Sequence, residues 1–437
     1  MNPVDSSHKR KHFVIVGNGG AGISAAKAAC SAGYQGIIHM VSDIEGPTFN
    51  PMLSPYYLSG EIVYERCFPF GKEFYEKNSI QCHFGSPVEA IDTQQQKVYV
   101  SGGGMIPYDD CLIATGASPL LPKVPGIQNS YNVFTLRTAE QMIRLKKALM
   151  GAKNAVILGA SLIGIKLAEV LMRKGIRVIL VELTKQVLPF FAHPQLAPII
   201  HEHLLNKGVD LRLSWALEGL EEKKGRVYLH FQEDQIVKTD LVLICIGIKP
   251  NLEFLKGTQI EVDRGIIVDD HMQTNINHVY AAGDVSQGTN QLTGKKEMMG
   301  LWGNACYQGR TAGYNVAGMN VSYPGYLPQY VNHFFGITFI HLGDINPQGG
   351  EIEILKQFEP SEGIYSLLVF DKGVLVGANL INNLKEAGRL KTAILRKQTK
   401  EGGLSRYFFY PSGKDFNLIK PVFSPSFMLA KKDSFYN

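Results

Sequence analysis

Short apolar runs that end in glycine-containing turns recur along the chain, and each is followed by a segment of helical character. Residues 12–16 (HFVIV) lead into the turn GNGGAG and an alanine-rich stretch. Residues 154–158 (NAVIL) lead into the turn GASLIG and a second helical stretch, about 140 residues later. An apolar strand followed by a helix is the repeating unit of an open parallel sheet. The pattern therefore predicts an α/β protein with two such units.

The first turn has the spacing G-x-G-x-x-G, which is typical of dinucleotide binding. The first glycine permits a tight turn, the second lets the backbone approach a pyrophosphate, and the third lets the helix pack on the strand. The helix N-terminus offers free N–H groups to the phosphates. The next strand (GIIHMVSD) ends 26 residues after the first glycine in an aspartate, which suits the two hydroxyls of an adenosine ribose. The residues expected to bind the dinucleotide at this first turn are Gly17, Gly19, Gly20, Ala21, Gly22 and Asp43.

The second turn keeps the outer glycines, Gly159 and Gly164, but has Ser161 in place of the middle one. Serine is small, so the backbone can still approach a pyrophosphate. The strand VILVE ends at Glu182, 23 residues after the first glycine. A glutamate there favours the free 2′-hydroxyl of NAD and repels the 2′-phosphate of NADP, and the nearby Lys185 weakens this preference slightly. The residues expected to bind NAD(H) are Gly159, Ser161, Leu162, Ile163, Gly164 and Glu182.

Three further strand-like stretches end in a glycine. They are YDDCLIATGASP (108–119), TDLVLICIGIKPN (239–251) and INHVYAAGDVSQG (276–288). With the two glycine turns they make five motifs in order. In this the chain resembles the two-dinucleotide-binding flavoproteins, the pyridine nucleotide–disulfide oxidoreductases, over residues 11–320.

The resemblance implies that FAD binds at the first glycine turn and exchanges hydride with a pyridine nucleotide at the second. It implies that Asp284 of the GD motif contacts the ribityl or phosphate part of FAD, and that the backbone of Val88 meets the adenine ring. The glycine-ended strands lie near the crossings between the two domains in this family. Further candidates for cofactor contact are therefore Ala114, Thr115, Gly116 and Gly247.

The same resemblance predicts an α/β fold with two Rossmann-like dinucleotide-binding domains and a C-terminal α+β domain. The FAD-binding domain is expected to be discontinuous. The predicted parts are residues 1–120 and 250–325 for FAD, 121–249 for NAD(H), and 326–437 for the C-terminal domain and tail. Such a C-terminal domain usually forms the dimer interface in this family, which suggests a homodimer or hetero-oligomer.

The segment FNPMLSPYYLSG (49–60) corresponds to the loop beside the flavin. Disulfide reductases of the family carry C-x-x-x-x-C there and related enzymes a single cysteine, but residues 43–60 contain no cysteine. A thiolate must touch the flavin to exchange electrons with it, so thiol chemistry is not expected. Cys67, beyond the loop, is interpreted as a partly buried structural thiol.

Many relatives also place a lysine beside the flavin and pair it with a glutamate two residues after the last glycine of the second turn. Here Asn50 or Pro51 takes the place of the lysine, and Lys166 takes that of the glutamate. A cation near the N5–O4 edge of the flavin would stabilise its anionic reduced form. Lys166 is therefore a candidate catalytic residue, and the alternative is a solvent-facing helix lysine.

With no thiol, the flavin must pass its electrons to oxygen, a quinone, a small carrier or a partner subunit. Residues 300–343 resemble NADH-oxidising subunits such as those of phenylglyoxylate dehydrogenase and tungsten aldehyde oxidoreductases. This favours a subunit that works with an iron–sulfur subunit or a ferredoxin-like carrier. The alternatives are a free-standing NADH oxidase, a reductase of a carrier such as rubredoxin, and a signalling protein that uses NADH as a conformational ligand.

Residues 383–414 are rich in Lys and Arg, with only Glu386 and Glu401 opposing them. A solvated helix face explains this composition, and so does a surface that steers an acidic redox partner. The aromatic tail, residues 416–437, suggests either packing on its own domain or docking to a partner. The basic residues are Lys385, Arg389, Lys391, Arg396, Lys397, Lys400, Arg406 and Lys414.

Other features narrow the class of protein. The net charge of +5 is too small to argue for nucleic acid, and no apolar stretch is long enough to span a membrane. Six cysteines without a C-x-x-C pair and an N-terminus without a signal peptide predict a reduced, cytoplasmic chain. No metal is expected, because His201 and His203 would point to different sides of a helix.

Overall fold

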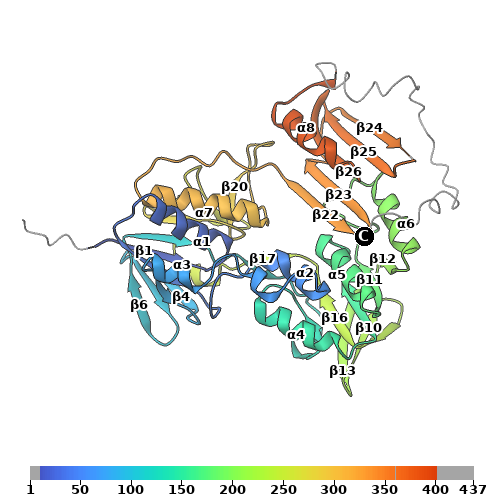
Figure 1. The fold of residues 1–437 in the computed structure, drawn as a ribbon, viewed down its shortest axis with the longest axis horizontal. Coiled ribbons are helices and arrows are strands. Elements are labelled where there is room, and N and C mark those ends of the chain that lie inside the picture. The colour runs from blue at the N-terminus through green and yellow to red at the C-terminus, as the bar shows by residue number, and fades with distance from the viewer. Residues whose placement is uncertain (1–9, 360, 401–437) are drawn as a thin grey trace, which may run out of the picture.

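The computed structural model describes residues 10–359 and 361–400. Two parallel sheets with covering helices and a C-terminal antiparallel sheet make up the molecule, and helix α2 lies between the first sheet and the other two (Figure 1). The predicted fold class, two Rossmann-like units and an α+β domain, is confirmed. The aromatic tail and the basic residues Arg406 and Lys414 lie outside the described residues.

The first sheet is parallel and has the order β19-β7-β1-β2-β3. Its edge strand β19 comes from a much later part of the chain than the other four strands. The strands and helices of this unit are β1 (His12–Val16), α1 (Gly20–Ser31), β2 (Ile37–Val41), α3 (Lys72–Lys77), β3 (Gln81–His83), β7 (Asp110–Ile113), β19 (Val279–Ala281) and α7 (Trp302–Val316). Helices α1 and α7 cross closely, because a Cβ at Gly309 or Gly313 would overlap the backbone of α1. An antiparallel sheet follows, made of β4 (Val88–Asp92), β5 (Lys97–Val100) and β6 (Gly104–Pro107).

The second sheet is also parallel, with the order β12-β11-β10-β16-β9. Successive β10 residues face opposite sides, so Ile157 packs among the helices while Val156 and Leu158 pack against an antiparallel sheet. The elements of the parallel sheet are β9 (Val133–Phe134), α4 (Ala139–Leu149), β10 (Asn154–Leu158), α5 (Leu162–Arg173), β11 (Arg177–Glu182), α6 (Ala197–Asn206), β12 (Asp210–Leu213) and β16 (Leu241–Ile244). The antiparallel sheet comprises β13 (Leu217–Lys223), β14 (Arg226–Phe231) and β15 (Gln235–Thr239).

The chain passes between the two units twice, and the two crossings lie side by side. Strands β8 (Ala117–Pro119) and β17 (Ile248–Pro250) pair there in antiparallel fashion. The amide of Leu120 donates to the carbonyl of Gly247 at 2.9 Å, and Asn251 Nδ2 donates to the carbonyl of Thr115 at 2.9 Å. The first unit is therefore built from two parts of the chain, one before and one after the second unit. The short elements near them are η3 (Ile127–Asn129), η4 (Glu253–Leu255), β18 (Ile266–Ile267), β20 (Ser286–Thr289) and β21 (Lys296–Glu297).

Helix α2 and two short 3₁₀ turns fill the space between the first unit and the second. They are η1 (Pro51–Leu53), α2 (Ser54–Ser59) and η2 (Tyr64–Cys67). Asn50 begins η1, and its side chain accepts a hydrogen bond from the amide of Met52 at 3.1 Å. Leu58 and Cys67 belong to the same buried cluster as the helices of the second unit. The segment beside the predicted flavin site is therefore part of the interface between the units.

The C-terminal sheet is antiparallel, with the order β22-β23-β26-β25-β24. One face packs on α8, and the other packs on the second unit. The buried Asn379 links the two bodies, because its side chain donates to the carbonyl of Phe191 at 2.9 Å and accepts from the amide of His193 at 2.7 Å. The elements are β22 (Gln329–Phe334), β23 (Ile337–Gly343), β24 (Ile352–Glu359), β25 (Ile364–Asp371), β26 (Val374–Ile381) and α8 (Leu384–Leu395).

Candidate active site

The first glycine turn has the geometry that a pyrophosphate-binding loop requires. Gly17 has φ +116°, and a Cβ there would overlap the carbonyl of Ala114, while a Cβ at Gly22 would overlap the carbonyl of Gly17. A Cβ at Gly19 would have no atom within 4 Å, so this side of the turn is open. Helix α1 starts at the next residue without a side-chain cap. Its first N–H groups are thus available to phosphate oxygens, and this turn fits the pyrophosphate of FAD.

A hydrogen-bonded strap fixes the loop that follows β2 against this turn. Asn18 Oδ1 accepts from Thr48 Oγ1 at 2.8 Å and from the Tyr75 hydroxyl at 2.9 Å, and Asn18 Nδ2 donates to the carbonyl of Gly46 at 3.1 Å. Thr48 is fully buried. The sequence reasoning missed this network, because its three members come from different segments. The polar side chain of Asn18 in an otherwise small-residue turn gave no sign of the pairing.

The predicted adenosine-binding residues lie at the carboxyl ends of the strands. Asp43 is exposed, two residues after the end of β2. The amide of Ser86 donates to the carbonyl of Ser42 at 2.8 Å, which brings the start of β4 and therefore Val88 to the same edge as Asp43. An exposed carboxylate beside a strand end suits a ribose diol.

Asp284 has a partner that the sequence reasoning missed. Arg137 Nη2 lies 2.7 Å from Asp284 Oδ2, and the same nitrogen would lie 3.3 Å from a Cβ at Gly116. The turn that carries Asp284 is held from behind by Gln308 of α7, whose Oε1 accepts from the amide of Gly283 at 2.8 Å. The structure therefore brings together the GD motif, the end of the ATG motif and an arginine between the two units. In the sequence, the one sign of Arg137 is its position. It is a single basic residue in the run FTLRTAEQ, just before the capped start of α4.

The second glycine turn repeats the geometry of the first with one difference. Gly159 has φ +104° and approaches the carbonyl of Cys245, and a Cβ at Gly164 would overlap the carbonyl of Gly159. Ser161, in the middle position, caps α5: its hydroxyl accepts from the amide of Gly164 at 3.3 Å and donates to the carbonyl of Cys245 at 2.8 Å. Its side chain is therefore bound to the protein, and the serine is tolerated because it supplies a helix cap.

Glu182 is held by the backbone rather than exposed. Its Oε2 accepts from the amide of Ala160 at 2.9 Å and its Oε1 accepts from the amide of Thr184 at 3.0 Å, and the residue is buried. These bonds tie the carboxylate to the second glycine turn. Each oxygen keeps a lone pair that a ribose hydroxyl can use. Lys185 is exposed three residues later.

Cys67 is fully buried, and burial raises the pKa of its thiol. Its carbonyl accepts from the amide of Asn50 at 2.8 Å, which fixes the start of the flavin-side segment. Buried thiols with a raised pKa are poor nucleophiles because little thiolate forms. The role of Cys67 in the structure is therefore to support the loop.

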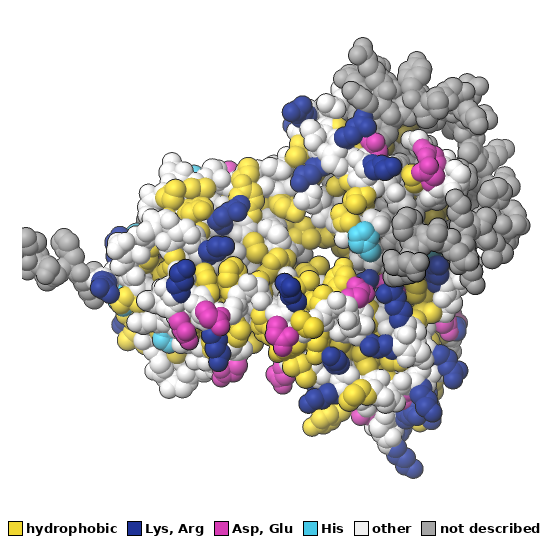
Figure 2. Space-filling model, viewed as in Figure 1, with side chains coloured by type: hydrophobic (Ala, Val, Ile, Leu, Met, Phe, Trp, Pro, Cys, Tyr) yellow, Lys and Arg dark blue, Asp and Glu magenta, His cyan; other side chains and the backbone are white. Residues whose placement is uncertain are grey.

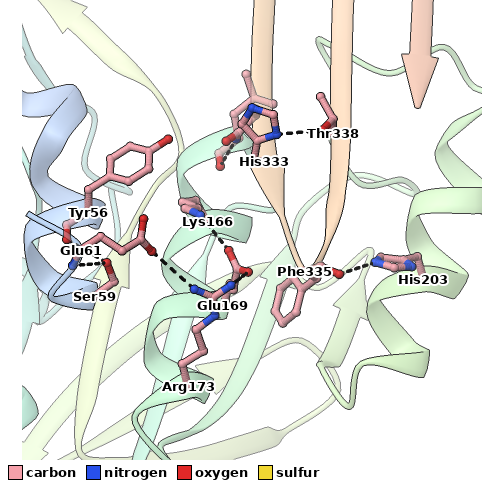
Figure 3. Close-up of polar contacts among 12 residues, drawn as sticks. Tyr56, Ser59, Glu61, Lys166, Glu169, Arg173, His203, His333, Phe335 and Thr338 are labelled. Atoms are coloured by element: carbon pink, nitrogen blue, oxygen red, sulfur yellow. Dashed lines mark hydrogen bonds and ion pairs between the residues drawn. The ribbon is translucent and has the colours of Figure 1, made fainter. Parts of the chain in front are cut away.

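Lys166 lies in the interior, so its interpretation as a solvent-facing helix lysine is wrong. The residue is 7% exposed, and its Nζ lies 2.9 Å from Glu169 Oε2 and 5.3 Å from the centre of the Tyr56 ring of α2 (Figure 3). The reason is packing: α2 covers the face of α5 on which Lys166 lies. The lysine is thus placed between the two nucleotide-binding units.

Comparison with known proteins decides the family. Residues 11–309 match the sequence profile of the pyridine nucleotide-disulphide oxidoreductases. This chain belongs to that family. Residues 330–398 match the C-terminal domain of rubredoxin NAD+ reductase. As a pyridine nucleotide-disulphide oxidoreductase, the chain is an oxidoreductase that uses FAD and NAD(H), as its two glycine turns predicted.

Similar proteins cover almost the whole chain. The epsilon subunit of NADH-dependent phenylglyoxylate dehydrogenase from Aromatoleum evansii is 30% identical over 93% of this chain and 97% of its own length. The NADH-rubredoxin oxidoreductase of Clostridium acetobutylicum is 28% identical over 88% of this chain and 95% of its own length. The structure of a covalent putidaredoxin reductase–putidaredoxin complex aligns with a TM-score of 0.82, at 25% identity, over 89% of this chain and 93% of that one.

Two classes of feature are absent from residues 10–359 and 361–400. In that part of the chain no group of three or more His, Cys, Asp or Glu side chains is arranged to hold a metal ion. The same part has no helix that is long and apolar enough to cross a membrane.

Proposed function

We propose that the chain moves a hydride between NAD(H) and FAD and exchanges electrons with an iron–sulfur subunit or ferredoxin-like carrier of a larger oxidoreductase. The observation that carries this proposal is the lack of a reactive thiol within the flavin-side segment. Residues 43–60 contain no cysteine, and Cys67 is buried behind that segment. A flavoprotein of this family without a reactive thiol needs an external electron acceptor or donor.

The first unit would hold FAD. The open side of the glycine turn at Gly19 and the uncapped N-terminus of α1 suit the pyrophosphate, and Asp43 suits the adenosine ribose. Asp284, oriented by Arg137, lies next to the ATG strand end and suits the ribityl chain or the phosphates. Asn50 and Pro51 begin the segment proposed to lie against the flavin ring.

The second unit would hold NAD(H). Gly159 and Gly164 shape its turn, and Glu182 lies at the end of β11 where it can accept from a ribose hydroxyl. The buried carboxylate disfavours a 2′-phosphate, because like charges at close range in a poorly solvated place repel strongly. We therefore propose NADH rather than NADPH as the substrate.

FAD, when bound, would supply the exchange between a two-electron donor and one-electron carriers. The protein contributes the placement. The two crossings, β8 and β17, fix the units relative to each other, and α2 fills the space between them. Placing two reactants in fixed proximity is a large part of the catalysis of a transfer reaction.

The relatives support an iron–sulfur partner. Their names include a phenylglyoxylate dehydrogenase subunit and a rubredoxin oxidoreductase, and one similar structure is a complex with putidaredoxin. Separate Lys and Arg side chains, with Asp and Glu side chains between them, lie on and after α8 in the C-terminal domain (Figure 2). They suit steering of an acidic carrier, since complementary charge speeds encounter. The described members of this group are Lys385, Arg389, Lys391, Arg396, Lys397 and Lys400.

A free-standing carrier reductase is the second candidate. It is favoured by the match of residues 330–398 to the C-terminal domain of rubredoxin NAD+ reductase. In that case a small soluble carrier would accept the electrons without a permanent partner subunit. We also propose a cytoplasmic location, supported by six cysteines that are all free thiols, and assembly through the C-terminal domain.

The test combines anaerobic reduction with a choice of acceptors. The purified chain, reconstituted with FAD, is mixed with NADH, and reoxidation is followed with a rubredoxin, with a [4Fe–4S] ferredoxin and with oxygen. We expect rapid bleaching of the flavin by NADH, fast reoxidation by an iron–sulfur protein and slow reoxidation by oxygen. Reoxidation by oxygen as fast as by either carrier would instead indicate an NADH oxidase.

Native purification separates the two candidates. A complex of this chain with subunits that contain iron and acid-labile sulfide supports the proposed subunit role. A chain that is isolated alone and reduces rubredoxin at full rate supports the free-standing reductase. Bleaching by NADPH faster than by NADH would contradict the assignment of the pyridine nucleotide.

A further inference from the structure

A row of four charged side chains joins helix α5 to the segment that ends α2 (Figure 3). Lys166 Nζ lies 2.9 Å from Glu169 Oε2, and Glu169 Oε1 lies 2.6 Å from Arg173 Nη2. Arg173 Nη1 lies 3.4 Å from Glu61 Oε1, just past the C-cap of α2. The row therefore connects the NAD(H) unit with the segment beside the proposed flavin site.

The side chains of this row differ in how far they are exposed to solvent. The side chains of Lys166 and Glu169 are 9% and 4% exposed, whereas that of Arg173 is 59% exposed. Glu169 is shared between two cations, so its single negative charge is not available to Lys166 alone. With Glu61 included, the four side chains carry no net charge, and the more buried of the two cations is Lys166.

Lys166 lies between the second glycine turn and α2, the helix of the segment proposed to lie beside the flavin. It stands two residues after Gly164, at the start of the second turn of α5, and its ammonium faces Tyr56 of α2. Asn332 of β22 donates to the carbonyl of Leu162 at 2.9 Å, so β22 contacts the start of α5. A nicotinamide delivered by the second glycine turn and a flavin delivered by the first can exchange hydride only between these two units.

We propose that Lys166 raises the reduction potential of the bound flavin, and that Glu169 and Arg173 are positioning residues that set how much of its charge is cancelled. This inference rests on the proposed function. Transfer of a hydride, one proton with two electrons, converts NADH to NAD+ and adds one negative charge to the flavin. A buried ammonium favours that added charge more than an exposed one does, because little water screens it.

The arrangement fixes the sign of each substitution. Lys166→Met keeps most of the aliphatic stem and leaves Glu169 paired with Arg173, so the group gains a net negative charge. Glu169→Gln leaves Lys166 without a carboxylate while Arg173 keeps Glu61, so the group gains a net positive charge. Lys166→Arg keeps the charge. The expected order of the flavin potential is therefore Glu169→Gln above the unchanged protein, and Lys166→Met below it.

Lys146 provides a matched control. Its Nζ lies 3.9 Å from the centre of the ring of Tyr57, the residue next to Tyr56 on α2, but Lys146 is exposed on α4. Water and salt screen an exposed charge, so Lys146→Met should leave the potential unchanged. A general effect of removing a lysine from this helix interface would appear in both variants.

The experiment measures the midpoint potential of the FAD-loaded protein against reference dyes, with dithionite as the reductant. For Lys166→Met we expect the equilibrium constant for reduction to fall by at least about tenfold, which is about 30 mV for a two-electron couple. Lys166→Arg should stay within about threefold of the unchanged protein, and Glu169→Gln should shift the potential upward. Lys166→Gln replaces Lys166→Met if the latter does not bind FAD.

An unchanged potential in both neutral Lys166 variants would overturn the inference. A downward shift in Glu169→Gln as well would also overturn it, since a loss of packing, unlike a charge effect, has the same sign in both. Because dithionite replaces NADH, this outcome is separate from the proposed function. Failure of NADH to reduce the flavin of the unchanged protein would contradict the proposed function and leave the measured potentials valid.

Discussion

The guanidinium of Arg137 lies 2.7 Å from the carboxylate of Asp284, although 147 residues separate them in the chain. The first residue stands just before the capped start of α4, and the second stands in the turn after β19. The pair therefore fixes the beginning of the second unit against the GD turn of the first. Beside it lies Gly116, at the end of the ATG strand.

Replacing Arg137 should weaken FAD binding. Without its partner, Asp284 presents an uncompensated negative charge toward a cofactor that itself carries phosphates. For Arg137→Ala we expect the dissociation constant of FAD, measured by fluorescence titration, to rise at least about tenfold, or about 1.4 kcal/mol. The exposed pair of Arg212 and Asp210 supplies the control, and Arg212→Ala should leave FAD binding unchanged. Equal affinity in both variants would contradict the prediction.

Substitutions at two glycines of the first turn should have different effects, one on cofactor binding and the other on the stability of the fold. Gly19→Ala introduces a methyl group that meets no protein atom within 4 Å, so the apoprotein should keep its stability. The same methyl group would occupy the open side of the turn, so FAD affinity should fall at least about tenfold. Gly22→Ala would overlap the carbonyl of Gly17, and should lower the melting temperature of the apoprotein. Normal FAD binding by Gly19→Ala would show that the pyrophosphate lies elsewhere.

Glu182 should control the choice between NADH and NADPH. Removing its carboxylate in Glu182→Ser removes the repulsion of a 2′-phosphate and an acceptor for the 2′-hydroxyl. The ratio of kcat/KM for NADH to that for NADPH should fall at least about tenfold in steady-state assays. Lys185→Glu, at an exposed position, should change the same ratio in the opposite direction and by less. An unchanged ratio in Glu182→Ser would show that the carboxylate only holds the turn through Ala160.

Three histidines lie side by side on adjacent strands of the first sheet and should make the stability of the protein depend on pH. His39 Nε2 lies 2.9 Å from His12 Nδ1, and His39 Nδ1 lies 3.2 Å from His83 Nε2. Burial, with smaller contributions from His83 and His12, lowers the pKa of His39 to about 4. The neutral ring can donate on one side and accept on the other, whereas the protonated ring can only donate.

The direction of this pH dependence follows from the difference between the pKa of His39 in the folded protein and its pKa in the unfolded protein. The pKa of His39 is lower in the folded than in the unfolded protein, so the unfolded protein takes up a proton first as the pH falls. The free energy of unfolding should be highest above about pH 6.5 and decrease from there towards pH 4, by about 1–3 kcal/mol from this residue. In urea unfolding at a series of pH values, His39→Leu should show a smaller decrease over that window. An equal decrease would rule out His39 as the source.

Asn379 should hold the C-terminal sheet on the second unit. It is fully buried and makes hydrogen bonds to the backbone of Phe191 and His193. Asn379→Ala leaves the amide of the buried His193 without this partner, whereas the carbonyl of Phe191 keeps His341 Nδ1 at 3.0 Å, and the free energy of unfolding should fall by about 1–3 kcal/mol. Asn275 also makes two hydrogen bonds to backbone groups but is exposed, so Asn275→Ala should cost less than about 1 kcal/mol. Equal losses would mean that burial is not the cause.

Local sequence patterns determined most of the fold and the location of the two nucleotide loops. A glycine turn after an apolar strand acts within a few residues: Gly17 and Gly159 have positive φ, and Gly22 and Gly164 leave no room for a side chain. The alternation of strand and helix then specifies a parallel sheet. The lack of a cysteine within residues 43–60 is likewise readable from the residue order alone.

Only the tertiary structure decided which distant side chains meet. The pairing of Arg137 with Asp284, the strap around Asn18 and the burial of Lys166 beneath α2 all depend on how separate segments pack. Ser161 and Glu182 were found as candidates from spacing, but their bonds to Cys245, Ala160 and Thr184 emerged only in the folded chain. The physical reason is the separation along the chain over which each effect acts. Backbone conformation and hydrophobic periodicity are set by near neighbours, whereas the partner of a charged or polar side chain is set by sheets and helices brought together across the chain.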